Sequence, residues 1–338
     1  MGELFTRLGH MLGTLFFSPG STFSALSLVF ALGMSIAFLR LRKPGKSRRL
    51  KVMMRALFPR WLWRSRSMRA DIGFFFLNVF VTGGLIGWGL LSYGAISQGT
   101  ADALTHSLGA PHDMLTSPLL RSIVLTVALF IAYDFAYWLD HYIKHKVPVM
   151  WAFHRVHHTA EVLSPLTAFR MHPIDSLVFY NITAVIMGVT HGALLYAMGA
   201  PAQEMALSGT NIILLGFIFV TVHLQHSHIP IRFTGLLGRL IFSPAHHHIH
   251  HSTDRAHYDS NLGSCLAIWD WMFGTLILPE PRQKPLSFGA SDPADTASPH
   301  SLSGSLLHPF VQAARSLLPK PSPVAKAPEP PSIHMKLL

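Results

Sequence analysis

Histidine is the residue type that dominates the chemistry available to this sequence, because its copies cluster at regular spacings. Of the 22 histidines, 16 lie between residues 141 and 257. A His-x-x-His-His pattern occurs at 154–158 and again at 247–251, and a His-x-x-x-His pattern occupies 141–145. Residues three and four positions apart share one face of a helix, so each pattern can direct its imidazoles to one point. Neutral imidazole binds iron, zinc, copper and nickel, and the clusters therefore predict a metal site.

The last cluster is the densest, with five histidines among residues 246–251. At about 100° per helical residue, His247, His250 and His251 fall within an arc about 100° wide, and His246 and His248 flank it. We therefore predict the first three as ligands and the other two as bystanders. All clusters together offer about eight to ten imidazoles, more than one ion coordinates, which favours two metal ions.

The composition indicates a membrane protein. Half of the 338 residues are hydrophobic, 13% are charged and the mean hydropathy is +0.36, which is too apolar for an ordinary soluble enzyme. The net charge of +11 is concentrated, because twelve Lys and Arg and no acidic residue lie between 40 and 69. Between apolar segments such a run indicates a cytoplasmic loop and not a nucleic-acid-binding surface. The single cysteine, Cys265, excludes an intrachain disulfide and a thiolate-held metal site within one chain.

Apolar stretches predict the membrane spans, since a helix needs about 20 residues to cross hydrocarbon. The candidates are residues 23–39, 72–96, 119–139, 177–197 and 210–222. The last stretch is short, so a full span and a re-entrant helix both stay open. The second carries glycines suited to close helix packing, namely Gly83, Gly84, Gly87 and Gly89. The expected fold is an all-α integral membrane protein with about four to five transmembrane helices, arranged as an N-terminal span and two hairpins. A cytoplasmic helical cap is expected to carry the dimetal site.

Loop charges set the expected orientation. The loop at 40–69 holds twelve basic residues and the predicted polar loop at 97–118 holds none, so the first is expected in the cytoplasm. With the spans placed as above, every histidine cluster then emerges on the cytoplasmic side. We expect an integral protein of a bacterial inner membrane with its site at the cytoplasmic face.

Three regions follow from these features. Residues 1–71 are expected to hold the N-terminal span and the basic loop, and residues 72–280 the membrane-embedded catalytic domain. Residues 281–338 are rich in Pro, Ser and Ala and lack periodicity, which predicts a disordered tail.

Several segments together resemble the fatty acid hydroxylase/sterol desaturase superfamily of membrane-bound di-iron oxygenases. The resemblance covers about residues 119–280. Its motifs are 134–145 (DFAYWLDHYIKH), 154–158 (HRVHH), 225–227 (QHS), 247–251 (HHIHH), 258–263 (YDSNLG) and 269–275 (WDWMFGT).

The resemblance implies a set of metal ligands. By position these are His141, His145, His154, His157, His158, His226, His247, His250 and His251, with His223 as a tenth candidate. His228 follows Ser227 where relatives often have Asn, so the choice among His223, His226 and His228 stays open. Asp134 and Asn261 are candidates for orienting ligating imidazoles, and His172, in the segment 170–173, is a further site candidate.

The implied activity is hydroxylation or desaturation of a lipid C–H bond by two iron ions, with dioxygen and two external electrons. Zinc can occupy the same imidazoles in a purified sample. The chain has no recognisable flavin, nicotinamide or haem segment, so a separate donor of ferredoxin or cytochrome type with its reductase is expected. Fatty acyl, sterol-like, carotenoid and amino-lipid substrates all remain open.

Two other functions are compatible with the histidines. A zinc-dependent membrane hydrolase needs a carboxylate as general base, and Glu161 and Asp254 are the nearest in sequence. A histidine-rich metal-binding or transport protein would place ligands at mid-membrane, where only His191 is expected.

Overall fold

The computed structural model describes residues 2–21, 23–42, 50–82, 90–110, 115–280, 285–290 and 298–318. Helices dominate this part of the chain, and its one short hairpin pairs β1 (Ala206–Leu207) with β2 (Thr210–Asn211). The expected all-α architecture is therefore correct apart from this hairpin.

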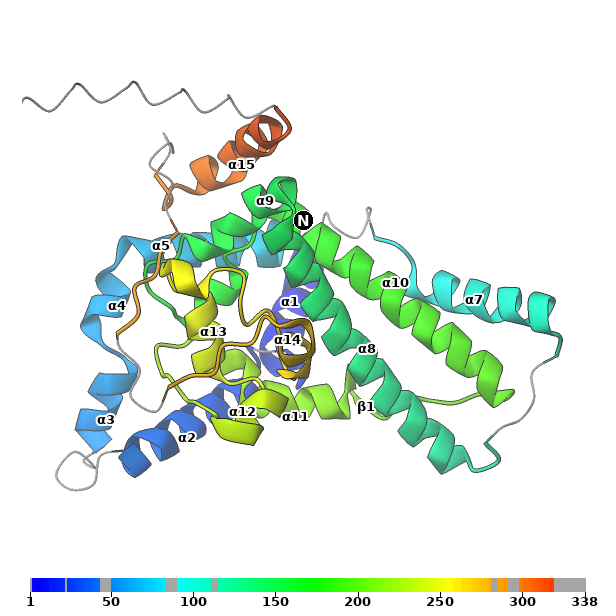
Figure 1. Ribbon diagram of the computed structural model, residues 1–338. Coiled ribbons are helices and arrows are strands. Elements are labelled where there is room, and N and C mark those ends of the chain that lie inside the picture. The colour runs from blue at the N-terminus through cyan, green and yellow to red at the C-terminus, as the bar shows by residue number, and fades with distance from the viewer. Residues whose placement is uncertain are drawn as a thin grey trace, which may run out of the picture.

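Two long helices, α8 (Pro118–Lys146) and α10 (Pro173–Met198), form an antiparallel pair in the half of the molecule to the right in Figure 1. Ser117 and His172 cap their first turns, and both helices have proline as the first residue, which suits a helix start. Gly199 ends α10 at a φ of 62°, a left-handed conformation that favours glycine. Both helices are long and apolar enough to cross a membrane.

The predicted helices at 119–139 and 177–197 are thus present, and each is longer than its apolar stretch. Outward-facing apolar side chains such as Ile123, Val127 and Val189 are exposed, as expected for contact with lipid.

The predicted span at 72–96 is wrong as a single helix. Helix α5 (Arg66–Phe76) passes into a π-helical turn, η2 (Leu77–Thr82), and a separate helix, α7 (Tyr93–Leu108), follows. Residues 83–89, with the four glycines expected to pack helices, lie outside the described residues. The predicted polar loop at 97–118 is also mostly helix, because α7 occupies its first half.

Helix α7 lies against α10 (Figure 1), and two glycines of α10 make this possible. A Cβ at Gly192 would lie 2.2 Å from the Ser97 carbonyl oxygen, and one at Gly188 would lie 2.8 Å from the Ile96 side chain. These distances are too short for any side chain, so the close packing of α7 requires glycine at both positions.

The stretch at 210–222 does not form a full span. Helix α11 (Ile212–Val220) has nine residues, about 14 Å, against about 30 Å of hydrocarbon. Its N-cap, Asn211, donates to the carbonyl of Thr126 within α8, so α11 starts beside the body of that helix. The structure therefore favours the re-entrant alternative.

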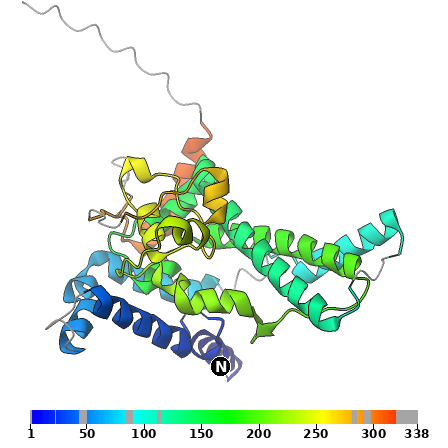
Figure 2. The same cartoon turned by 60° about the horizontal axis from the view of Figure 1, so that its bottom comes forward.

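The N-terminal apolar stretch forms α2 (Ala25–Arg42), which follows α1 (Gly2–Phe17) and lies beside α11, as Figure 2 shows. Phe30 stacks on Phe219 with ring centroids 4.8 Å apart. Within the described residues only α8 and α10 meet the length and hydropathy of a span, so the expected count of four to five is not confirmed.

The basic segment at 40–69, predicted to connect two spans in the cytoplasm, is mostly helical. It contains α3 (Leu50–Leu57), α4 (Arg60–Arg64) and the start of α5, and residues 43–49 lie outside the described residues. Met53, Leu57 and Leu62 are buried while the basic side chains from Lys51 to Arg69 stay exposed.

The tail at 281–338 is ordered in part, which corrects the expectation of disorder there. Helix α15 (Leu302–Ser316) packs on α9 (Pro148–His158), at the top of Figure 1. Upstream, the amide of Ala290 donates to the His158 carbonyl, and the amide of Thr253 donates to the Ser287 carbonyl. Residues 281–284, 291–297 and 319–338 lie outside the described residues.

The remaining elements gather where α8 ends, α10 begins and α11 ends (Figure 1). They are η4 (Pro165–Phe169), η5 (Val222–Leu224), α12 (Gly235–Leu240), α13 (Pro244–His250), η6 (Arg255–His257) and α14 (Ile268–Phe273). Helices α9 and α13 bring the two His-x-x-His-His patterns to this point.

Candidate metal centre

Nine of the ten predicted ligands form two compact groups of buried imidazoles. The first group takes its histidines from α8, α9 and α13, and the second from α9, the 225–227 segment, α13 and its C-cap. Within each group the candidate ligand atoms all lie within 4.8 Å of one another. The first group is His141, His145, His154, His158 and His250, and the second is His157, His226, His247 and His251.

In the first group, the Nδ1 atoms of four of the five histidines point to fixed acceptors. His141 donates to the Leu262 carbonyl at 2.8 Å and His250 donates to the Ser260 carbonyl at 2.9 Å. A carbonyl accepts only from a protonated nitrogen, so Nε2 of each ring carries the lone pair. Those Nε2 atoms have no hydrogen-bond partner within the described residues. This is the arrangement that a metal-binding histidine requires.

Two carboxylates fix two more rings of this group. The Nδ1 of His154 lies 2.9 Å from Asp175 Oδ2, and the Nδ1 of His145 lies 3.3 Å from Asp259 Oδ1. The hydrogen bond from His145 holds the pKa of Asp259 down at about 2, so this carboxylate is ionised near neutral pH.

The loop after α13 supplies both carbonyl acceptors. Asp259 and Asn261 have positive φ angles of 57° and 54°, an uncommon conformation for residues other than glycine. Asn261 is held by hydrogen bonds to the His246 carbonyl and, in both directions, to the backbone of Ile277. This curled backbone turns the carbonyls of Ser260 and Leu262 towards the first group.

The second group brings four Nε2 atoms into direct contact. His226 Nε2 lies 3.0 Å from His157 Nε2 and 2.8 Å from His247 Nε2, and His251 Nε2 lies 3.0 Å from His247 Nε2. One ring nitrogen holds either a proton or a lone pair, so neutral imidazoles cannot satisfy all these contacts by hydrogen bonds alone. Nitrogens that share a metal ion at about 2.1 Å lie about 3.0 to 3.4 Å apart. The residues of this group therefore fit a metal ion.

Burial keeps these imidazoles neutral. Desolvation, reinforced by neighbouring histidines, lowers the pKa of His157, His247 and His251 well below the usual value. Burial likewise lowers the pKa of His226 to about 3. A neutral imidazole is the form that binds a metal, so the lone pairs are available at physiological pH.

His223 stands outside both groups. Its Nδ1 contacts the Ile218 carbonyl, and its Nε2 has no partner in the described part of the chain. Of its competitors, His226 joins the second group, whereas His228 Nε2 donates to the Ala56 carbonyl at 2.8 Å. Among the three candidates, the structure brings only His226 into a ligand group.

The predicted bystanders of the last cluster are occupied elsewhere. His246 closes a capping box with Ser243 at the start of α13. His248 donates from Nε2 to the Ser227 carbonyl at 2.7 Å.

His172 and Asp134 hold the surroundings and contact no ligand directly. His172 accepts from the Ile174 amide and donates from Nε2 to the Leu306 carbonyl, so it joins the start of α10 to α15. Asp134 accepts from the amides of Cys265 and Leu266 and from the Trp269 indole. It therefore anchors to α8 the loop whose Leu262 carbonyl orients His141.

A cavity of about 580 Å³ opens onto both groups. His141 and His154 of the first group and His157 and His226 of the second are among its lining residues. The rest of its wall is mainly apolar, with Leu28, Phe169 and Phe179 among the lining residues. Its size is within the range of small-molecule sites, and its lining suits an aliphatic chain.

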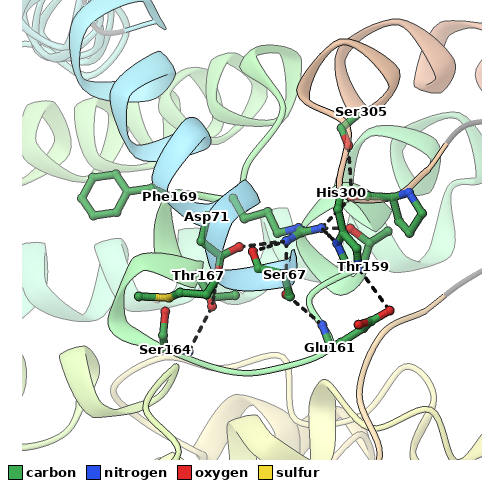
Figure 3. Close-up of polar contacts among 12 residues, drawn as sticks. Ser67, Asp71, Thr159, Glu161, Ser164, Thr167, Phe169, His300 and Ser305 are labelled. Carbon is green, nitrogen blue, oxygen red and sulfur yellow. Dashed lines mark hydrogen bonds and ion pairs between the residues drawn. The ribbon is translucent and has the colours of Figure 1, made fainter. Parts of the chain in front are cut away.

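A buried arginine ties α9 to two distant segments. Arg170 donates from Nε to the Val156 carbonyl and to Thr159, beside the ligands at the end of α9. Its Nη1 pairs with Asp71 of α5 at 2.9 Å, and its Nη2 donates to the Pro299 carbonyl ahead of α15. Figure 3 shows the side chains that converge from these separate elements.

Sequence reasoning missed several residues of the site. Asp175 and Asp259, which orient His154 and His145, were not predicted, and neither was Arg170 in a structural role. Asp259 lies inside the YDSNLG segment and Asp175 lies two residues after Pro173, so their proximity to recognised motifs is the only signal the sequence offered.

The structure is thus a helical protein in which two histidine groups that could hold metal ions adjoin a mainly apolar cavity. Residues 126–275 match the family model for fatty acid hydroxylase. This match agrees with the resemblance to the fatty acid hydroxylase superfamily that the histidine motifs indicate.

Curated relatives show the same similarity. Alkylglycerol monooxygenase of Homo sapiens is 28% identical over 173 residues, which cover 50% of this chain and 34% of that protein. The Xenopus tropicalis enzyme of the same name is 30% identical with the same coverage. Ornithine lipid hydroxylase OlsE of Rhizobium tropici is 30% identical over 156 residues, 46% of this chain and 42% of the relative. The matches thus span less than half the length of these relatives, and no solved structure matches the chain.

Proposed function

We propose that this protein is a membrane-embedded di-iron oxygenase that hydroxylates a C–H bond of a lipid. The observation that carries the proposal is the pair of imidazole groups, five and four histidines, that share one apolar cavity. The relatives named as a lipid monooxygenase and a lipid hydroxylase support the same chemistry.

Each part of the chain has a role in this proposal. Two iron ions, when bound to the histidine groups, supply oxygen activation and oxidation of the C–H bond. The carbonyls of Leu262 and Ser260, with Asp175 and Asp259, hold the imidazoles in one tautomer and orientation. The apolar wall of the cavity binds the aliphatic part of the substrate and excludes water.

The reaction needs a partner. Insertion of one oxygen atom into a C–H bond and release of the other as water consume two electrons and two protons. The chain has one cysteine, Cys265, which is buried, so it offers no thiol pair as an electron source. A separate ferredoxin- or cytochrome-type donor with its reductase is proposed to deliver the electrons.

The proposed location is a bacterial inner membrane, with the metal centre at the cytoplasmic face. The end of α8, the start of α10 and the end of α11 lead to the same histidine groups, which supports placing all clusters on one side. The basic residues of α3 to α5 support the cytoplasmic assignment.

Hydrolysis by a zinc centre is the weaker candidate, because the predicted general bases are committed elsewhere. Glu161 pairs with His300 at 3.1 Å, and Asp254 caps the η6 turn. Neither residue lines the cavity. The metal-transport candidate is weaker still, since His191 is hydrogen-bonded to Tyr93 and stacked on it.

Lipid mass spectrometry of cells with and without the gene tests the proposal. We expect a lipid one oxygen atom heavier only when the gene is present, and iron in the purified protein. His250→Ala should abolish product formation and leave membrane insertion intact. His248→Gln, which alters a neighbouring imidazole outside both groups, is the matched control and should retain activity. Unchanged lipids, or turnover that persists without oxygen, would reject the oxygenase.

A further inference from the structure

A buried polar chain runs from the cavity to one of the candidate ligands. Asp140 lines the cavity and its Oδ2 lies 2.6 Å from the Nζ of Lys144. Lys144 also pairs with Asp175, whose other oxygen binds His154. All four side chains are buried, with Asp140 and Lys144 only 4% and 3% exposed. The chain therefore fixes the position of the Asp140 carboxylate next to the histidines.

Asp140 has one oxygen left over. Oδ1 is buried and has no hydrogen-bond partner in the described part of the protein. Leaving a buried acceptor unpaired is costly, and native proteins seldom do so without a reason.

A second unpaired acceptor lines the same cavity. Asn78 of η2 donates both of its amide hydrogens, at 2.7 Å to the Phe169 carbonyl and at 2.9 Å to the Met171 carbonyl. This fixes the orientation of the amide and leaves Oδ1 as an acceptor, again buried and without a partner among the described residues. Two residues from independent elements thus line the cavity and each carries an unpaired acceptor.

The charges of the cavity favour the same type of ligand. Lys144 is the only Lys or Arg among the described residues that line it, and two carboxylates already neutralise this ammonium. Apart from the proposed metal ions, the described residues that line the cavity therefore offer no unpaired Lys or Arg to a carboxylate or a phosphate. Asp140 and Asn78 offer unpaired acceptors, which bind hydroxyl, amide N–H or ammonium groups.

We propose that Asp140, held by Lys144, determines specificity by binding a hydrogen-bond donor that the lipid carries close to the carbon to be oxidised. The substrate class is then an aliphatic alcohol, amide or amine, and the site discriminates against free fatty acids and against phosphate groups inside the cavity. This inference rests on the proposed function, because it names the substrate of the same site.

Equilibrium binding tests the inference separately from turnover. The full-length, metal-loaded protein in nanodiscs is titrated without oxygen with four probes of equal chain length: hexadecan-1-ol, hexadecan-1-amine, 1-methoxyhexadecane and hexadecanoate. Each affinity is corrected for partition into empty nanodiscs. We expect the alcohol and the amine to bind about tenfold or more tightly than the ether and the acid, the size of one hydrogen bond to a charged group.

Variants then locate the selectivity. In the Asp140→Leu variant, the affinity for the alcohol should fall to that for the ether. The Asp140→Asn variant keeps an acceptor oxygen, so it should still prefer the alcohol over the ether but should prefer the amine less strongly than the wild type does. Asp102→Leu changes an exposed carboxylate on α7 and should alter neither. If Asp140→Leu does not insert or fold, the order of probe affinities in the wild type and the result for Asp140→Asn still test whether Asp140 recognises a hydrogen-bond donor.

Two outcomes overturn the inference. Wild-type protein that binds the ether or the acid as tightly as the alcohol has no donor recognition, and an Asp140→Leu variant that keeps the preference places recognition elsewhere. Either result leaves the oxygenase proposal intact if lipids still gain oxygen. Conversely, absence of iron and of oxygenated lipid rejects the proposed function whatever the binding shows.

Discussion

The Nδ1 of His154 lies 2.9 Å from Oδ2 of Asp175, a residue of another helix, and this contact directs the Nε2 of His154 into the first histidine group. Hydrogen-bond partners of this kind typically contribute about 10- to 100-fold to metal affinity. We therefore expect Asp175→Leu to weaken the metal bound by the first group by a factor in that range, measured by competition with a chelator. Asp102→Leu is the control, and equal affinity of the Asp175→Leu and wild-type proteins would contradict the role of Asp175.

The two histidine groups should bind metal independently. The double variant His157→Ala/His247→Ala removes half of the second group and leaves the first intact, so it should hold one ion per chain where the wild-type holds two. His141→Ala/His250→Ala should likewise retain one ion, in the second group. Elemental analysis of the purified proteins measures the ratio. Loss of both ions from either variant would show that the groups form one coupled centre.

Acid should destabilise the metal-free protein. Burial lowers the pKa of both His246 and His248 from 6.5 to about 4. Between pH 6.5 and pH 4 these two histidines bind protons in the unfolded chain and remain neutral in the folded chain. The free energy of unfolding is therefore highest above pH 6.5 and falls progressively towards pH 4.

The variant His248→Gln isolates one of these groups, because glutamine can still donate to the Ser227 carbonyl and does not titrate. Between pH 6.5 and pH 4 the free energy of unfolding of this variant should fall less steeply with acid than that of the wild type. The difference corresponds to about one proton fewer taken up on unfolding. Unfolding in detergent at several pH values measures this slope. A slope identical to that of the wild type would show that His248 does not titrate as its burial implies.

Loss of Arg170 should destabilise the fold. Arg170→Met leaves Asp71 buried without its partner, a change that typically costs about 3–5 kcal/mol. The double variant Arg170→Met/Asp71→Leu removes both charges and should recover part of that loss. Thermal unfolding compares the three proteins. If the double variant is as unstable as the sum of its single changes, the pairing of the two charges is not the cause.

The clustering of the histidines was largely predictable from local sequence patterns. Helical spacing predicted His247, His250 and His251 as ligands and His246 and His248 as bystanders. The structure places the first three in the two histidine groups and the other two outside them. The apolar runs that became α8 and α10 were also visible, because a long uninterrupted stretch of apolar residues has few alternatives to a helix.

Other predictions failed where local composition competes with packing. The apolar run at 72–96 does not continue as one helix, and the polar run at 97–108 became α7, which depends on Gly188 and Gly192 of α10 for its place. The tail contains α15, whose Phe310 ring packs edge-on against the Phe153 ring of α9. None of these partners lies nearby in the sequence.

The sequence by itself determined which imidazoles could act together, because helical periodicity is a local property of a few residues. Only the tertiary structure decided how they divide into two groups, since His157 and His158 are neighbours in the chain yet belong to different groups. It also decided which carboxylates and carbonyls orient them and that Asp140 and Asn78 face one cavity. Such contacts join residues 10 to 121 positions apart, and their distances depend on the packing of whole elements, which no local pattern encodes.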